Sequence, residues 1–257
     1  MSDPFPPSSP VIAPIVPKKR SIVYIDGFNF YYGMLAERSD LKWLNYQRLA
    51  ELLRPDDDIL KVRLFTSVVD QDPRRRPGES TKHDRQSRIL AALRTQPKIT
   101  ITPGKFSDRE RECLVSSSCC SVPKGPQRKY WGREEKQTDV QLALQIVLDV
   151  QEEKAAGRQL ANIVLLSGDI DMLPALAVAF QQDKKVRAVI YIPVHEAQLK
   201  HRRKDEFSKY CDPVKPIPEK YLRLAQFPDI VELRPGVTVE RPIEWPKPVP
   251  PVRSTSA

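Results

Sequence analysis

The sequence predicts an α/β fold in which helices cover both faces of a mostly parallel sheet. Two short apolar runs, at 21–25 and 162–166, have the unbroken hydrophobicity of strands buried on both faces, and each ends in a polar turn. Strand-like and helix-periodic segments alternate along the chain, which favours parallel strands joined by crossover helices. With 257 residues, of which 40% are hydrophobic, the chain can bury a large core, so full disorder is excluded.

We expect five strands and five helices between residues 20 and 192. Strands are expected at 21–25, 61–69, 98–102, 162–166 and 185–191, where apolar and β-branched residues dominate. Helices are expected at 28–37, 46–53, 81–94, 139–153 and 173–182, where apolar residues recur every three or four positions. Pro174 falls in the first turn of the last helix, where its missing N–H removes no hydrogen bond.

Proline marks both ends of the chain. Of 25 prolines, eleven lie within 4–17 and 242–251, where their fixed φ favours extended chain over helix or sheet. We therefore divide the chain into a Pro-rich N-terminal tail at 1–19, a folded domain at 20–212 and a Pro-rich C-terminal extension at 213–257. The apolar runs are too short to span a membrane, and no secretory leader pattern follows Met1, so the expected location is cytoplasmic.

The net charge of +9 arises from a single segment. Residues 61–136 hold 18 Lys and Arg against 9 Asp and Glu, whereas the remainder holds 24 of each sign. Such a basic block indicates a face that meets polyanions, although a solvated surface with scattered arginines is the alternative.

Part of this block, residues 106–135, lacks the periodicity of the surrounding elements. We expect it to be an insertion or long loop, which in a compact domain is usually functional. The cysteines in and beyond it contain no Cys-x-x-Cys pair, so reduced thiols are favoured over a zinc site. Next to Arg128 and Lys129, the pair Tyr130 and Trp131 can stack on unpaired bases or anchor the loop hydrophobically.

Four aspartates are expected at one edge of the sheet. Asp26 follows the first strand, and Asp169 and Asp171 follow the strand at 162–166, at the carboxyl edge where open α/β sheets bind ligands. Asp139 opens the helix that leads into this second strand, so it lies at the same edge. Any one of them alone could be a turn or cap residue.

Together, four carboxylates would raise one another's pKa and oppose folding, and a divalent cation removes that cost. All-oxygen ligands without histidine or thiolate indicate Mg²⁺ or Mn²⁺. On the same helix, Gln141, Gln145 and Asp149 recur every four residues and are expected to form its solvated polar stripe. Asp139 lies about 200° from Gln141, off that stripe.

A metal site beside a basic surface suits phosphodiester cleavage, because the ion activates a water and neutralises developing charge. The basic block would hold the nucleic-acid backbone with little sequence selectivity. The basic residues expected to do so are Arg74, Arg75, Arg76, Arg128 and Lys129.

Three motifs carry a resemblance to a known family. Residues 23–29 (VYIDGFN), 134–140 (EEKQTDV) and 166–171 (LSGDID), with Pro174, resemble the NYN domain family of PIN-like ribonucleases, and most closely its bacterial LabA-like branch. The likeness covers about 20–212, and residues 241–245 (RPIEW) are similar to the usual end of that branch. The resemblance implies a PIN-like Rossmannoid three-layer fold with a mostly parallel five-stranded sheet.

The resemblance also implies a metal-dependent endoribonuclease acting on single-stranded or structured RNA. Its Mg²⁺ or Mn²⁺ ligands would be Asp26, Asp139, Asp169 and Asp171. DNA stays open as a substrate.

The same resemblance assigns roles to three further residues, with Asn29 and Lys136 as catalytic residues beside the aspartates and Ser167 as a supporting residue. Asn29 would hold a phosphate, a metal-bound water or the Asp26 carboxylate, and Ser167 would brace the Asp169 loop. Lys136 would reach the scissile phosphate or form an ion pair with Glu134 or Glu135.

Two positions depart from the family pattern. Gln145 stands where many relatives have an acid, and Ile170 where the residue is often small. A catalytically weak or inactive RNA-binding regulatory module is therefore the alternative function. A glycosyltransferase using the Asp169-Ile170-Asp171 triplet would leave Asp26 and Asp139 unexplained. Asp205 matches a recurring aspartate of the branch, with a role limited to capping or supporting the site.

Overall fold

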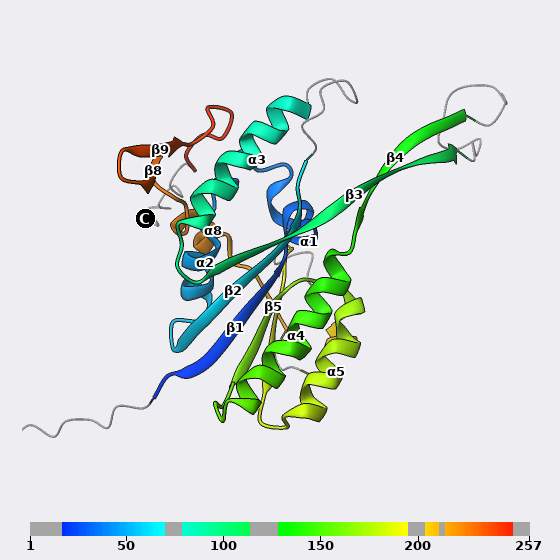
Figure 1. Cartoon of the computed structure of the whole chain (residues 1–257), viewed down its shortest axis with the longest axis vertical. Coiled ribbons are helices and arrows are strands. Elements are labelled where there is room, and N and C mark those ends of the chain that lie inside the picture. Colours follow the sequence, from blue (N-terminus) through cyan, green and yellow to red (C-terminus); the bar gives the residue numbers. More distant parts are fainter. Residues whose placement is uncertain (1–16, 70–78, 114–127, 195–203, 211–213, 249–257) are drawn as a thin grey trace, which may run out of the picture.

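The computed structural model describes residues 17–69, 79–113, 128–194, 204–210 and 214–248. Its centre is one sheet with the strand order β4-β3-β2-β1-β5-β6-β7, flanked by helices, and the expected α/β class is confirmed (Figure 1). In this order, the six strands β3, β2, β1, β5, β6 and β7 are parallel to their neighbours. The edge strand β4 is antiparallel to β3. This architecture is consistent with a PIN-like fold.

The five expected strands are all present, and the sheet has two more. The additions are β4 and a two-residue edge strand, β7, which is too short to leave a sequence pattern. The strands of the sheet are β1 (Lys19–Asp26), β2 (Asp57–Ser67), β3 (Ile99–Cys113), β4 (Arg128–Lys136), β5 (Asn162–Leu166), β6 (Arg187–Ile192) and β7 (Lys215–Pro216). A separate hairpin joins β8 (Ile230–Arg234) to β9 (Val237–Glu240).

The expected helices are present with small shifts of their ends. They are α1 (Gly27–Phe30), which a π-helical turn at Tyr31–Leu35 continues, α2 (Tyr46–Leu53), α3 (Glu79–Arg94), α4 (Thr138–Ala155) and α5 (Leu173–Gln182). Short helices follow at α7 (Lys204–Phe207) and α8 (Glu219–Leu224), and 3₁₀ turns lie at Ser39–Leu41 and Ile170–Met172. Within the described ranges, no helix combines the length and the hydrophobicity that a membrane span requires.

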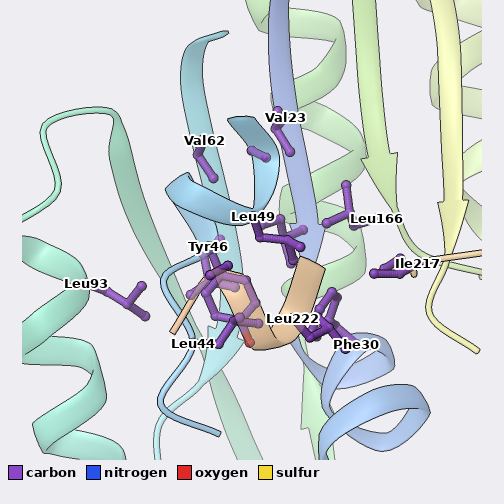
Figure 2. Close-up of a cluster of buried hydrophobic side chains, with 14 of the residues drawn as sticks. Val23, Phe30, Leu44, Tyr46, Leu49, Val62, Leu93, Leu166, Ile217 and Leu222 are labelled. Carbon is purple, nitrogen blue, oxygen red and sulfur yellow. The ribbon is translucent and has the colours of Figure 1, made fainter. Parts of the chain in front are cut away.

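The sheet separates two hydrophobic clusters. Along β1 the buried side chains alternate, so that Ile22 and Tyr24 pack with α4 and α5 while Val23 and Ile25 pack with α2, α3 and α8. Figure 2 shows the cluster that contains Val23 and Ile25, to which β1, β2, α2 and α8 all contribute. Burial on both faces explains why residues 22–25 of β1 are continuously apolar.

The segment 214–248 packs against the domain. Ile217, Leu222 and Phe227 are buried in the cluster around α2. The indole N–H of Trp43 donates to the carbonyl of Pro228 (2.7 Å). This part of the proline-rich extension therefore completes the hydrophobic core on one face of the sheet.

The expected loop at 106–135 is corrected by the structure. Its described parts, 106–113 and 128–135, form a long antiparallel ribbon of β3 and β4, and Figure 1 shows this ribbon extending away from the helices. Beyond Gly104, the one described strand that pairs with β3 is β4. A two-stranded ribbon of this kind needs no alternating apolar face against the core, so the usual strand pattern is missing.

The expected solvated stripe on α4 is also wrong. Asp149 is fully buried, where Arg63 donates to both of its oxygens and the Tyr24 hydroxyl donates to one of them (2.8 Å). Gln145 donates to the same carboxylate (3.2 Å). The exposed face of the helix instead carries apolar side chains, namely Val140, Leu144 and Leu148.

Candidate active site

Three carboxylates meet at the carboxyl edge of the sheet. Asp26 is the last residue of β1, Asp169 follows β5, and Asp139 lies in the first turn of α4. One carboxylate oxygen of each lies within 4.8 Å of the other two. Asp26 is 4% exposed, whereas Asp139 is open to solvent, so the cluster runs from a buried floor to the surface.

Two hydrogen bonds fix the Asp26 carboxylate. The backbone N–H of Asn29 donates to Oδ1 (2.9 Å), and the Ser167 hydroxyl donates to Oδ2 (3.0 Å). The chain turns from β1 into α1 at Gly27, where a Cβ atom would lie 2.6 Å from the carbonyl oxygen of Phe65. Glycine is therefore required for the close approach of this turn to β2.

The loop after β5 is tied to the same turn. Asn29 Oδ1 accepts from the backbone N–H of Gly168 (3.1 Å), and the Ser167 hydroxyl accepts from the backbone N–H of Asp169 (3.1 Å). Asp169 Oδ1 in turn accepts from the backbone N–H of Asp171 (2.9 Å). Asn29 and Ser167 thus connect the two aspartate-bearing loops.

The start of α4 is fixed by its contact with β3. Gln137 has a φ of 79°, a left-handed conformation that is uncommon for a residue with a side chain. The next residue, Thr138, is buried against Gly104, where a Cβ atom would lie 2.4 Å from Thr138 Cγ2. Only the glycine in β3 signals this contact in the sequence. The turn and the contact together position Asp139 at the edge of the sheet.

The cluster is electrostatically unfavourable by itself. Although Asp139 is exposed as a whole residue, partial desolvation of its carboxylate, followed by the negative charges of Asp169 and Asp171, raises its pKa. Asp171 is exposed and lies outside the three-residue cluster, although its charge reaches Asp139. The structure thus brings three of the four expected aspartates together, with the fourth beside them. Oxygen donors alone, under mutual repulsion, fit a hard divalent cation.

Five of the remaining expected residues lie in β4 of the ribbon. Lys136 is the exposed last residue of β4, three positions before Asp139. The part of β4 farther from Asp139, toward the far end of the ribbon, holds Arg128, Lys129, Tyr130 and Trp131. The other expected basic residues, Arg74, Arg75 and Arg76, fall outside the described residues.

The two positions that depart from the family pattern have structural partners. Gln145 belongs to the buried network around Asp149, and Ile170 packs against the cluster under α4 and α5. Asp205 lies in α7. The network around Asp149 was not expected from the sequence. The Tyr24 hydroxyl in a buried strand could have signalled it, because a buried hydroxyl requires a partner.

The residues that build this site coincide with a known domain. Residues 20–213 match the NYN domain. The chain belongs to the NYN domain family. NYN domains are generally nucleases that act on nucleic acids, and the acidic cluster is compatible with the divalent-metal dependence typical of them.

Individual relatives are more distant. A 6-hydroxy-3-succinoylpyridine 3-monooxygenase of Pseudomonas putida, HspA, is 27% identical over 200 residues, which cover 68% of this chain and 59% of the relative. The chain therefore spans about three fifths of that relative's length. This identity is too low for the relative's activity to be transferred to the chain.

Solved structures show weaker likeness. A protein of unknown function from Vibrio parahaemolyticus has 12% identity and a TM-score of 0.40, covering 79% of this chain and 94% of the other. A UDP-glucosyltransferase from Polygonum tinctorium has 15% identity and a TM-score of 0.30, covering 88% and 38%. Both TM-scores are too low to support a functional assignment.

Proposed function

We propose that the chain is a metal-dependent endoribonuclease of the LabA-like branch of the NYN family, hydrolysing RNA phosphodiester bonds. The observation that carries this proposal is the cluster of Asp26, Asp139 and Asp169, in an NYN domain, at the carboxyl edge of the sheet. The motifs at 23–29, 134–140 and 166–171, together with residues 241–245, support the LabA-like branch.

The three clustered aspartates would hold Mg²⁺ or Mn²⁺, with Asp171 at the rim. A bound ion of this kind supplies an activated water and neutralises charge that develops on the phosphate. Ser167 and the Asn29 backbone keep the Asp26 carboxylate in one orientation, so the ligand set is preorganised before a metal arrives.

The basic segment supports RNA as the substrate. Lys136 stands exposed at the base of the ribbon, three residues from Asp139, and we assign it to the scissile phosphate. Residues farther along the ribbon and the arginines at 74–76 would hold the backbone, which gives salt-dependent affinity with little sequence selectivity.

Cleavage of RNA by the purified protein tests the proposal. We expect cleavage with Mg²⁺ or Mn²⁺, none in chelator, and a loss of at least about a hundredfold in Asp26→Asn and Asp169→Asn, since removing even an outer-shell partner costs tenfold to a hundredfold. Asp183→Asn is a matched control, because Asp183, like Asp169, accepts from the backbone N–H two residues on. Equal activity in all three variants would refute the proposal.

A second candidate is an RNA-binding regulatory module without turnover. The observation that favours it is the Gln145 side chain, which stands where relatives have an acid and donates to the buried Asp149. RNA binding that does not require metal, with no cleavage in any divalent ion, would identify this function.

A further inference from the structure

The ribbon of β3 and β4 has two faces that backbone register defines. Pairing runs regularly from Lys105 opposite Lys136 to Cys113 opposite Arg128, without a shift in register. In an antiparallel pair, residues directly opposite share a face, and successive residues along one strand alternate between faces. Register therefore assigns each of these residues to one face or the other.

The two faces differ in charge. The first face holds five basic residues and one acidic residue, from the pairs Lys105 and Lys136, Ser107 and Glu134, Arg109 and Gly132, Arg111 and Tyr130, and Cys113 and Arg128. The second holds two basic and four acidic residues, from the pairs Phe106 and Glu135, Asp108 and Arg133, Glu110 and Trp131, and Glu112 and Lys129. Within the ribbon, the basic excess is therefore confined to the first face.

The ribbon's base adjoins the acidic cluster. Lys136 is three residues from Asp139, and Gly104 packs directly against Thr138 at the start of α4. Figure 1 shows the base of the ribbon beside the N-terminal end of α4 and its far end well away from the helices. Nine paired positions correspond to a length of roughly 27 Å. A polyanion lying along the ribbon would thus end beside the start of α4, which bears Asp139.

We propose that the first face of the ribbon holds the RNA backbone and leads the strand to the aspartate cluster, while the second face does not contact RNA. The inference rests on the proposed function and adds the surface and path of the substrate. Four acids on the second face repel a phosphate chain, whereas five basic residues on the first attract it. The expected RNA-binding residues of β4 are thereby divided, with Arg128 and Tyr130 on the binding face and Lys129 and Trp131 on the other.

Two arginines on neighbouring pairs provide a matched test. Arg109 lies opposite Gly132 on the first face, and Arg133 lies opposite Asp108 on the second. Each is replaced by glutamine, so both variants lose one positive charge at positions one residue step apart along the ribbon. Binding of a fluorescent RNA hairpin with single-stranded flanks is measured in chelator over a series of salt concentrations, so that cleavage does not interfere.

We expect Arg109→Gln to weaken binding and to lower the slope of log affinity against log salt by about 0.7, the value for one lost phosphate contact on a single strand. Adding Arg111→Gln should lower the slope by about 1.4 in total. Arg133→Gln should leave affinity and slope unchanged. Circular dichroism and a thermal shift with Mn²⁺ verify that all variants keep the fold and the metal site.

Equal weakening by Arg109→Gln and Arg133→Gln overturns the inference, as does an unchanged slope in the double variant or a wild-type protein that does not bind the hairpin. Failure of the proposed function is a separate result. In that case the wild-type protein cleaves no RNA with Mg²⁺ or Mn²⁺, while the difference between the two faces persists in the binding assay.

Discussion

The two ends of α4 carry acidic side chains in opposite electrostatic surroundings. Near the C-terminal end, Asp149 is buried against Arg63, which donates to both of its oxygens. Glu153 accepts from Arg158 and Arg20, and these bonds lower its pKa to about 2. The protein supplies its own cations at this end of the helix.

At the N-terminal end of α4, partial burial of the carboxylate and the neighbouring acids both raise the pKa of Asp139. Asp139 lies beside Asp26 and Asp169, and its pKa is raised. A folded protein retains such an arrangement when the repulsion is relieved by something it binds. The comparison indicates that the acids near the C-terminal end of α4 stabilise the fold, whereas the acidic cluster at its N-terminal end is compatible with a divalent cation, which we propose it binds.

The largest change in stability is expected for a substitution near the C-terminal end of α4. Asp149→Asn should lower the free energy of unfolding by about 3–5 kcal/mol, because it leaves the Arg63 guanidinium without its counter-ion in a site where its side chain is only 13% exposed. Urea unfolding measures the loss. The double variant Asp149→Asn with Arg63→Met should recover part of it, and a loss below about 1 kcal/mol in the single variant would contradict the pairing.

At the N-terminal end of α4, the expected effect is a stabilisation of the protein by a bound metal ion. Mn²⁺ at a hundred times its dissociation constant should stabilise the wild-type protein by about 2.7 kcal/mol, seen as a rise in Tm. Asp139→Asn should abolish most of that rise, and Asp183→Asn, at the opposite edge of the sheet, should retain it. A rise of equal size in both variants would show that the ion binds away from the cluster.

The same contrast explains what the sequence could predict. An apolar run followed by an aspartate predicted where Asp26 and Asp169 lie, because the end of a buried parallel strand is a local signal. The buried face of α4 was not predictable from its own periodicity. Asp149 is buried because Arg63, 86 positions away in the sequence, neutralises it, and only the folded sheet brings the two together.

Two other segments also have a structure that the local sequence does not signal. Among the described strands, β3 and β4 pair only with each other beyond Gly104, so no alternating apolar face identified them. In the segment 214–248, frequent prolines concealed Ile217, Leu222 and Phe227, which pack in the core. Burial of these isolated apolar residues depends on their packing against α2 and the other elements of the same hydrophobic cluster, which has no signal in the local sequence.

A smaller effect is expected for pH at the C-terminal end of α4. The pKa of Glu153 is about 2 in the folded protein, below its ordinary value of 4.5, so its stabilising contribution is complete above pH 4.5 and is lost as pH falls toward 2. From about pH 5 to about pH 3 the wild-type protein should lose about 2 kcal/mol through this group. Glu153→Gln should lack this part of the dependence, and identical urea midpoints against pH in both proteins would contradict the assignment.

The smallest expected change in stability, that of Asp139→Asn, distinguishes the two ends of α4 most directly. In chelator at neutral pH, Asp139→Asn should stabilise the protein by about 0.5 kcal/mol, the size of a like-charge contact at an exposed position. The sign follows from the raised pKa, which means that the charged form of Asp139 is disfavoured in the folded state despite its place in the first turn of a helix. The gain should shrink as salt is added and reverse in Mn²⁺, where the wild-type protein alone keeps its full ligand set. Destabilisation by Asp139→Asn in chelator would instead mean that the folded chain already compensates this acid, as it does Asp149.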